Sequence, residues 1–164
     1  MKRHGFTIVE LIIIITVMGI LLTLGVVNLS GSQANARDAE RKSDLETIAI
    51  HLETFYTSGT DGSLTLGRYP STTELIGNEQ IILRDIDTNS LKAPGVSSSS
   101  LVAAINTLQT TAGVTPSPTK DTYVYQPLKS DGLLCVSSDQ DCQKFNLYYA
   151  FENGTKYIIT SKNQ

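Results

Sequence analysis

Glu10 is the residue whose position most strongly suggests a function. It is the only charged residue between Arg3 and Arg37, and the segment from Phe6 to Leu29 is otherwise apolar apart from Asn28 and scattered Thr and Gly. A carboxylate inside an apolar helix costs roughly 2.5–3.5 kcal/mol even on lenient scales of membrane insertion. We therefore expect this acid to serve a function and to need a cationic partner.

The rest of the chain has no arrangement of side chains typical of an enzyme. The sequence contains no phosphate-binding loop of the form G-x-x-x-x-G-K-[ST] and no G-x-S-x-G motif. His4 and His51 are its only histidines and neither lies near the two cysteines, which argues against a zinc site. We expect no enzymatic activity and no cofactor.

Composition narrows the class of protein further. The 164 residues include 13 Lys+Arg and 16 Asp+Glu, for a formal charge of −3. Such a balance excludes a strongly basic nucleic-acid-binding domain, and we predict no direct contact with nucleic acid. The apolar share of 40% is sufficient for a packed core.

The apolar N-terminal segment is long enough to cross a membrane. As a helix, its 24 residues would span roughly 36 Å, against a bilayer core of about 30 Å. Lys2 and Arg3 precede it, so its N-terminal end should stay in the cytoplasm and the rest of the chain outside. A plain membrane anchor is one interpretation, and a signal peptide cleaved after Ala34-Asn35-Ala36 is another.

The residues around Glu10 favour a third interpretation. Gly5-Phe6-Thr7-Ile8-Val9-Glu10-Leu11, after the short basic leader 1–4, closely resembles the class III signal of type IV pilins and the related pseudopilins. In that family a membrane peptidase cuts after the glycine and methylates the new N-terminal residue. The resemblance therefore implies cleavage between Gly5 and Phe6, and N-methylation of Phe6.

The resemblance also implies partners and a role for Glu10. In the family the glutamate meets the N-terminal amine of a neighbouring subunit, which would set the register of assembly. The implied partners are further pilin subunits, the prepilin peptidase and methyltransferase, membrane lipid before assembly, and an inner-membrane assembly platform with its ATPase. Cleavage would remove Lys2 and Arg3, leaving 11 basic and 16 acidic residues.

A second helical pattern follows the apolar segment. Leu45, Ile48, Leu52 and Phe55 recur at helical spacing and form one stripe. We expect one long helix from about Phe6 to Tyr56, the architecture that the resemblance also implies. The expected organisation is a leader (1–5), a transmembrane and filament-core half of the helix (6–29), an amphipathic half (30–56) and a globular α+β head (57–164).

The head combines short helices with β-strands. Ser71-Thr72-Thr73-Glu74 forms a capping box that should begin a short helix, and the spacing of Leu101, Ile105 and Leu108 predicts another. The expected strands are residues 123–126, ended by Pro127, then 133–136, and a hairpin of 145–151 and 156–160 around Asn153-Gly154. The predicted fold is α+β: a lollipop-shaped pilin fold whose long helix packs on a small C-terminal antiparallel sheet.

Cys135 and Cys142 are the only cysteines. Outside the cytoplasm such a pair most simply forms a disulfide, worth about 2.5 kcal/mol in the chain-entropy model, and two free thiols are the alternative. Asp139 and Asp141 lie between them and are weak candidates for binding calcium, as major pseudopilins of type II secretion do near the C-terminus, although those generally lack this disulfide. Solvated carboxylates are the alternative.

Three functions are compatible with the sequence. The leading one is a pilin, held in the cytoplasmic membrane by its N-terminal helix and then polymerised into an extracellular type IV pilus. The second is a pseudopilin of a type II secretion or competence system. The third belongs to another class, an extracellular binding domain with a signal peptide or membrane anchor.

Overall fold

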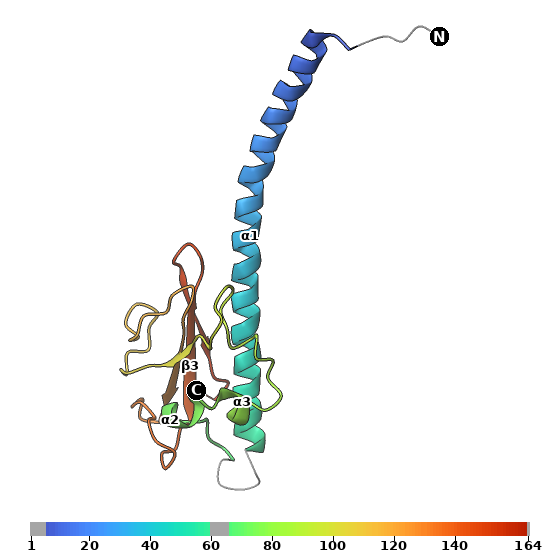
Figure 1. Cartoon of the computed structure of the whole chain (residues 1–164). Helices are drawn as coiled ribbons and strands as arrows, with labels where there is room; N and C mark the ends of the chain where they lie inside the picture. Colours follow the sequence, from blue (N-terminus) through green and yellow to red (C-terminus); the bar gives the residue numbers. More distant parts are fainter. Residues whose placement is uncertain (1–5, 60–65, 164) are drawn as a thin grey trace. The chain divides into compact units, whose positions relative to one another are not determined.

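A computed structural model describes residues 6–59 and 66–163, without the side chains of residues 27–30 (Figure 1). The predicted leader, with Gly5 and His4, lies outside the described residues. The chain divides into two compact units, Met1–Ala36 and Arg37–Gln164. The elements are α1 (Ile8–Ser58), α2 (Thr72–Leu75), α3 (Glu79–Ile82), β1 (Leu101–Ala103), β2 (Tyr123–Leu128), β3 (Lys144–Ala150) and β4 (Lys156–Thr160).

The C-terminal part of α1 supplies one wall of the core of the second unit. Leu45, Ile48 and Leu52 are fully buried and Phe55 is nearly so, which confirms the stripe predicted from their spacing. They pack in one cluster with side chains of the sheet, among them Phe145 and others of β2 and β3. The amphipathic pattern therefore positions this stretch of helix against the sheet, and the fold is α+β as expected.

The sheet has the order β1-β2-β3-β4 and is mixed. β2 pairs antiparallel with β3, and β3 with β4, but β1 runs parallel to β2 with Leu101 opposite Tyr123. The expectation of an antiparallel sheet was therefore wrong for one edge. Parallel neighbours need a crossover connection, and the long segment 104–122 between β1 and β2 provides it.

Two of the elements predicted within the head are not formed as expected. The helix expected over Leu101, Ile105 and Leu108 is absent: Leu101 belongs to β1 and is buried, whereas Ile105 is 73% exposed. Three apolar residues are too few to impose helical periodicity, and pairing with β2 decided the conformation instead. The strand expected at 133–136 is reduced to one bridge between Leu134 and Leu128.

β2 continues through Pro127 to Leu128 rather than ending before it. The carbonyl oxygens of Tyr125 and Pro127 accept from the backbone amides of Ala104 and Cys135, on the β1 side of the strand. The Pro127 nitrogen faces the same side of β2, away from β3. Because β1 has already ended there, the N–H that proline lacks removes no hydrogen bond between strands.

The predicted hairpin and capping box are confirmed. β3 and β4 flank Asn153-Gly154, where Gly154 has φ +81° and its amide donates to the carbonyl of Phe151 (2.9 Å). Only glycine adopts this backbone region without strain. At α2, Ser71 caps the helix and the Glu74 carboxylate accepts from the Ser71 amide in return.

A disulfide joins Cys135 and Cys142. The loop that it closes is bonded to the start of α2, because the Thr72 amide donates to the Cys135 carbonyl (3.1 Å) and the Tyr69 amide to the Cys142 carbonyl (2.8 Å). The crosslink and these bonds hold the two segments together.

Candidate assembly site at the N-terminus

The first unit presents an apolar surface that none of its described residues covers. Phe6 is 76% exposed, and the large apolar side chains described up to Val26 are all exposed. This stretch of α1 is long and apolar enough to cross a membrane. Contiguous apolar surface of this extent normally lies against lipid or protein.

Threonine hydroxyls within this stretch are bonded to the helix itself. Thr16 Oγ1 donates to the carbonyls of Ile12 and Ile13 (both 2.9 Å), and Thr23 Oγ1 to that of Ile20 (2.7 Å). Because these hydroxyls are bonded to backbone carbonyls of their own helix, they need no hydrogen bond from water or another chain. The threonines are therefore compatible with an apolar environment, which leaves Glu10 as the exceptional residue in the segment.

Glu10 lies in the first turn of α1 and is held by Thr7. The Glu10 carboxylate accepts from the Thr7 amide (2.9 Å) and the Thr7 hydroxyl (2.8 Å), while the Glu10 amide donates to the Thr7 hydroxyl (3.3 Å). This reciprocal arrangement is a capping box, and it fixes the direction of the carboxylate at the helix N-terminus. The sequence carries the signal for this capping box as the pattern T-x-x-E, from Thr7 to Glu10.

Charged residues also form a network around one buried arginine in the second unit. Arg41 is 1% exposed: its guanidinium donates to the carboxylates of Asp38 and Glu152 (both 2.8 Å) and to the Lys120 carbonyl (2.7 Å). Arg37 also donates to Glu152 (2.8 Å). These two guanidinium groups lower the pKa of Glu152 to about 2. Together with the bond from the Glu152 amide to the Asp38 carboxylate (2.9 Å), this network fixes the β3–β4 turn on α1.

Asp44 is a buried acid that sequence reasoning missed. It is 8% exposed, and the Tyr123 hydroxyl donates to its carboxylate (3.3 Å). Burial raises its pKa to about 7, with a further increase from Glu40 and Asp87, opposed by Tyr123 and Arg41. Asp44 lies on α1 between the buried stripe and the charged face, and no sequence pattern distinguishes it from the exposed acids nearby.

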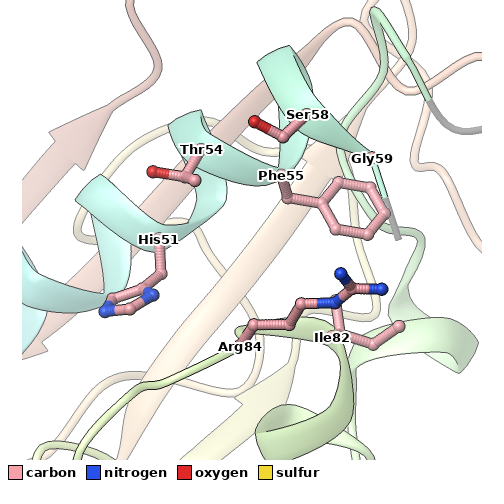
Figure 2. Close-up of a pocket in the computed structure, with 7 residues that line it drawn as sticks. All are labelled: His51, Thr54, Phe55, Ser58, Gly59, Ile82 and Arg84. Atoms are coloured by element: carbon pink, nitrogen blue, oxygen red, sulfur yellow. The ribbon is translucent and has the colours of Figure 1, made fainter. Parts of the chain in front are cut away.

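His51 lines a pocket of about 200 Å³ at the end of α1 (Figure 2). Thr54, Phe55 and Ser58 of α1 line one side, and Ile82 and Arg84 the other. The described lining contains no carboxylate, so it offers no pairing of His51 with an acid for general-base chemistry. His51 itself is half-buried.

The two calcium candidates are bonded within the disulfide loop. Asp139 accepts from the Ser137 hydroxyl, which lowers the pKa of that carboxyl, and Asp141 accepts from the Gln143 amide. Within the described residues no group of three or more His, Cys, Asp or Glu side chains is arranged to hold a metal ion.

Comparison with known proteins agrees with the N-terminal features. Residues 1–26 match the family model described as the prokaryotic N-terminal methylation motif. The chain is 29% identical over 76 residues to the type II secretion system core protein G of Dickeya chrysanthemi, an alignment that covers 46% of this chain and 45% of that relative. The chain thus spans less than half the length of the relative it matches, and no solved structure gave a significant match. The N-terminal motif and the partial similarity to core protein G both support the resemblance of this chain to type IV pilins and pseudopilins.

Proposed function

We propose that the chain is a structural subunit that prepilin peptidase cleaves between Gly5 and Phe6 and that then polymerises into an extracellular type IV pilus. The observation that carries the proposal is Glu10, a single acid in an exposed apolar helix, within the residues that match the methylation motif. Before assembly the exposed side chains from Phe6 to Val26 lie in lipid. In the filament they pack against the same segment of other subunits.

Glu10 acts in this proposal as the residue that sets subunit register. Cleavage creates an α-amino group at Phe6, which is mostly cationic near neutral pH. In an apolar interior, an ammonium and a carboxylate on neighbouring subunits are far more stable together than apart. The capping bonds from Thr7 hold the carboxylate in one direction and leave it lone pairs with which to accept from an incoming amine.

The N-terminus of the protein from cells tests the first step. A mass that corresponds to methylated Phe6 supports the proposal, a start at Arg37 indicates signal peptidase, and an intact Met1 indicates a plain anchor. The last two outcomes would each overturn it.

A Glu10→Gln variant tests the second step. We expect normal cleavage and membrane level but a large loss of sheared filaments in electron microscopy, because glutamine keeps the shape and removes the charge. Thr16→Val is the matched control in the same segment, since its hydroxyl is bonded within its own helix, and it should assemble normally. Wild-type filament yield from Glu10→Gln would refute the role of Glu10.

A pseudopilin of a type II secretion system is the second candidate, and the similarity to core protein G favours it. Deletion of the gene separates the two. Loss of surface filaments with intact protein secretion supports a pilin, whereas loss of secretion supports a pseudopilin. In either case the proposed partners are the peptidase, an inner-membrane assembly platform and its ATPase.

A further inference from the structure

A second pocket, of about 220 Å³, lies on the face of the sheet opposite α1. Phe145, Leu147 and Tyr149 of β3 point into the core shared with α1. Side chains alternate along a strand, so Lys144 and Asn146 point to the other face, where they line this pocket. The assembly role proposed for the N-terminal helix makes no use of it.

The Asn146 amide is held in one orientation by a buried hydrogen-bond network. Gln126 Nε2 donates to the carbonyls of Asn106 (2.8 Å) and Leu108 (3.2 Å), so Gln126 Oε1 must be the acceptor. That oxygen accepts from Asn146 Nδ2 (3.1 Å) and from the Tyr148 hydroxyl (2.8 Å). With its nitrogen directed to β2, the Asn146 amide turns its oxygen away from β2.

Thr160 lies on that other side. It is opposite Asn146 in the β3–β4 register, so its side chain shares the same face of the sheet, and it lines the pocket. The pocket floor therefore offers the Asn146 oxygen as an acceptor beside a hydroxyl that either donates or accepts. Ile158, also in the lining, supplies an apolar contact.

Lys144 gives the pocket a positive charge. Its side chain is half-buried, and across residues 6–59 and 66–163 its ammonium has no carboxylate within 4 Å. A partly desolvated ammonium gains from an anionic partner. A bound carboxylate would meet this requirement.

We propose that this pocket binds one acidic sugar unit, such as a hexuronate, alone or at the end of a glycan. The carboxylate pairs with Lys144, ring hydroxyls bond to Asn146 and Thr160, and one ring face rests on Ile158. The volume is below the roughly 300–1,000 Å³ of drug-sized sites, which suits a single ring. The side-chain oxygen of Asn146 accepts hydrogen bonds and therefore needs a ligand with a donor group. A simple anion without hydroxyl groups would leave this oxygen without a partner.

Chemical-shift titration tests the proposal on the processed full-length chain, labelled with ¹⁵N in phosphocholine micelles. Alkyl glycoside detergents are avoided because their head groups are sugars. The probes are glucuronate, glucose and acetate. We expect glucuronate to shift the backbone amides of Lys144, Asn146 and Thr160, and to bind at least tenfold more tightly than either other probe.

Two variants and a control complete the test. Lys144→Gln should weaken glucuronate binding roughly tenfold to a hundredfold, the range for a hydrogen bond to a charged group, and Thr160→Val should weaken it less. Lys129→Gln, a half-buried lysine outside the pocket lining, should have no effect. Absence of shifts at about 50 mM glucuronate, a level that detects even millimolar affinity, would overturn the proposal. So would equal binding of acetate, which indicates a plain anion site, or unchanged affinity in a folded Lys144→Gln protein.

Discussion

Replacing Asp44 with Asn should make the protein more stable at neutral and alkaline pH but not at acidic pH. Asp44 is buried against Tyr123, and its pKa rises from an ordinary 3.8 to about 7. An acid with a raised pKa in the folded state contributes its full stability below pH 4 and loses it as the pH rises toward 7. Asparagine keeps the shape, still accepts from the Tyr123 hydroxyl, and has no charge to bury.

The size of the effect follows from the shift in pKa. A difference of about 3 pKa units corresponds to about 4 kcal/mol at 1.36 kcal/mol per unit. The side chain lies at the edge of the core next to the charged groups Glu40, Arg41 and Asp87, where residual hydration reduces the cost of ionisation. We therefore expect Asp44→Asn to gain about 2 kcal/mol at pH 8 and almost nothing at pH 4.

Urea unfolding of the processed chain in micelles, followed by the near-ultraviolet circular dichroism of its tyrosines, measures this difference. Comparing the variant with the wild type at each pH cancels the other titrating groups, including Glu152, whose lowered pKa acts in the opposite direction below pH 4. Asp121→Asn is the control: Asp121 is exposed, so its replacement relieves no buried charge and should not reproduce the gain at pH 8. A stability difference for Asp44→Asn that does not depend on pH would refute the reasoning.

Three further substitutions test other contacts of the second unit. Arg41→Met should lower the free energy of unfolding by about 2 kcal/mol in urea titrations, because it leaves the half-buried carboxylates of Asp38 and Glu152 without a main partner. A loss under about 1 kcal/mol would mean that the network is solvated. Gln126→Leu should cost about 2–3 kcal/mol, since it removes the partners of several buried polar groups, and amides of the segment 104–115 should exchange faster with deuterium than in the wild type. Replacing both Cys135 and Cys142 with Ser should lower the free energy of unfolding by about 2 kcal/mol. If neither this double variant nor the reduced wild-type protein is less stable, that value is wrong.

Local patterns in the sequence predicted the elements that depend on near neighbours. The stripe from Leu45 to Phe55 follows from helical spacing, the Ser71 cap from a four-residue motif, and the β3–β4 hairpin from Asn153-Gly154. Each of these requires contacts within a few residues, or one apolar face that any core would bury. The resemblance to pilins and pseudopilins likewise rested on a short N-terminal motif.

Other features depended on segments far apart in the chain. Leu101 entered a strand because β2, some twenty residues later, offered it a parallel partner. Gln126 reads in the sequence as an ordinary polar residue of a strand, yet the loop folded across it makes it the centre of a buried network. Neither environment has a local signature.

Glu10 and Arg41 illustrate the difference between what the sequence determines and what only the tertiary structure decides. The sequence alone determined that Glu10 is exceptional, because the cost of an acid among apolar residues depends on composition and not on tertiary contacts. Only the tertiary structure decided that Arg41, one charge among many on a polar helix, is buried and paired with Glu152, more than a hundred residues away. Burial of a charge is stable only where distant groups supply its hydrogen bonds, so the fold had to bring them together before the role of Arg41 could be recognised.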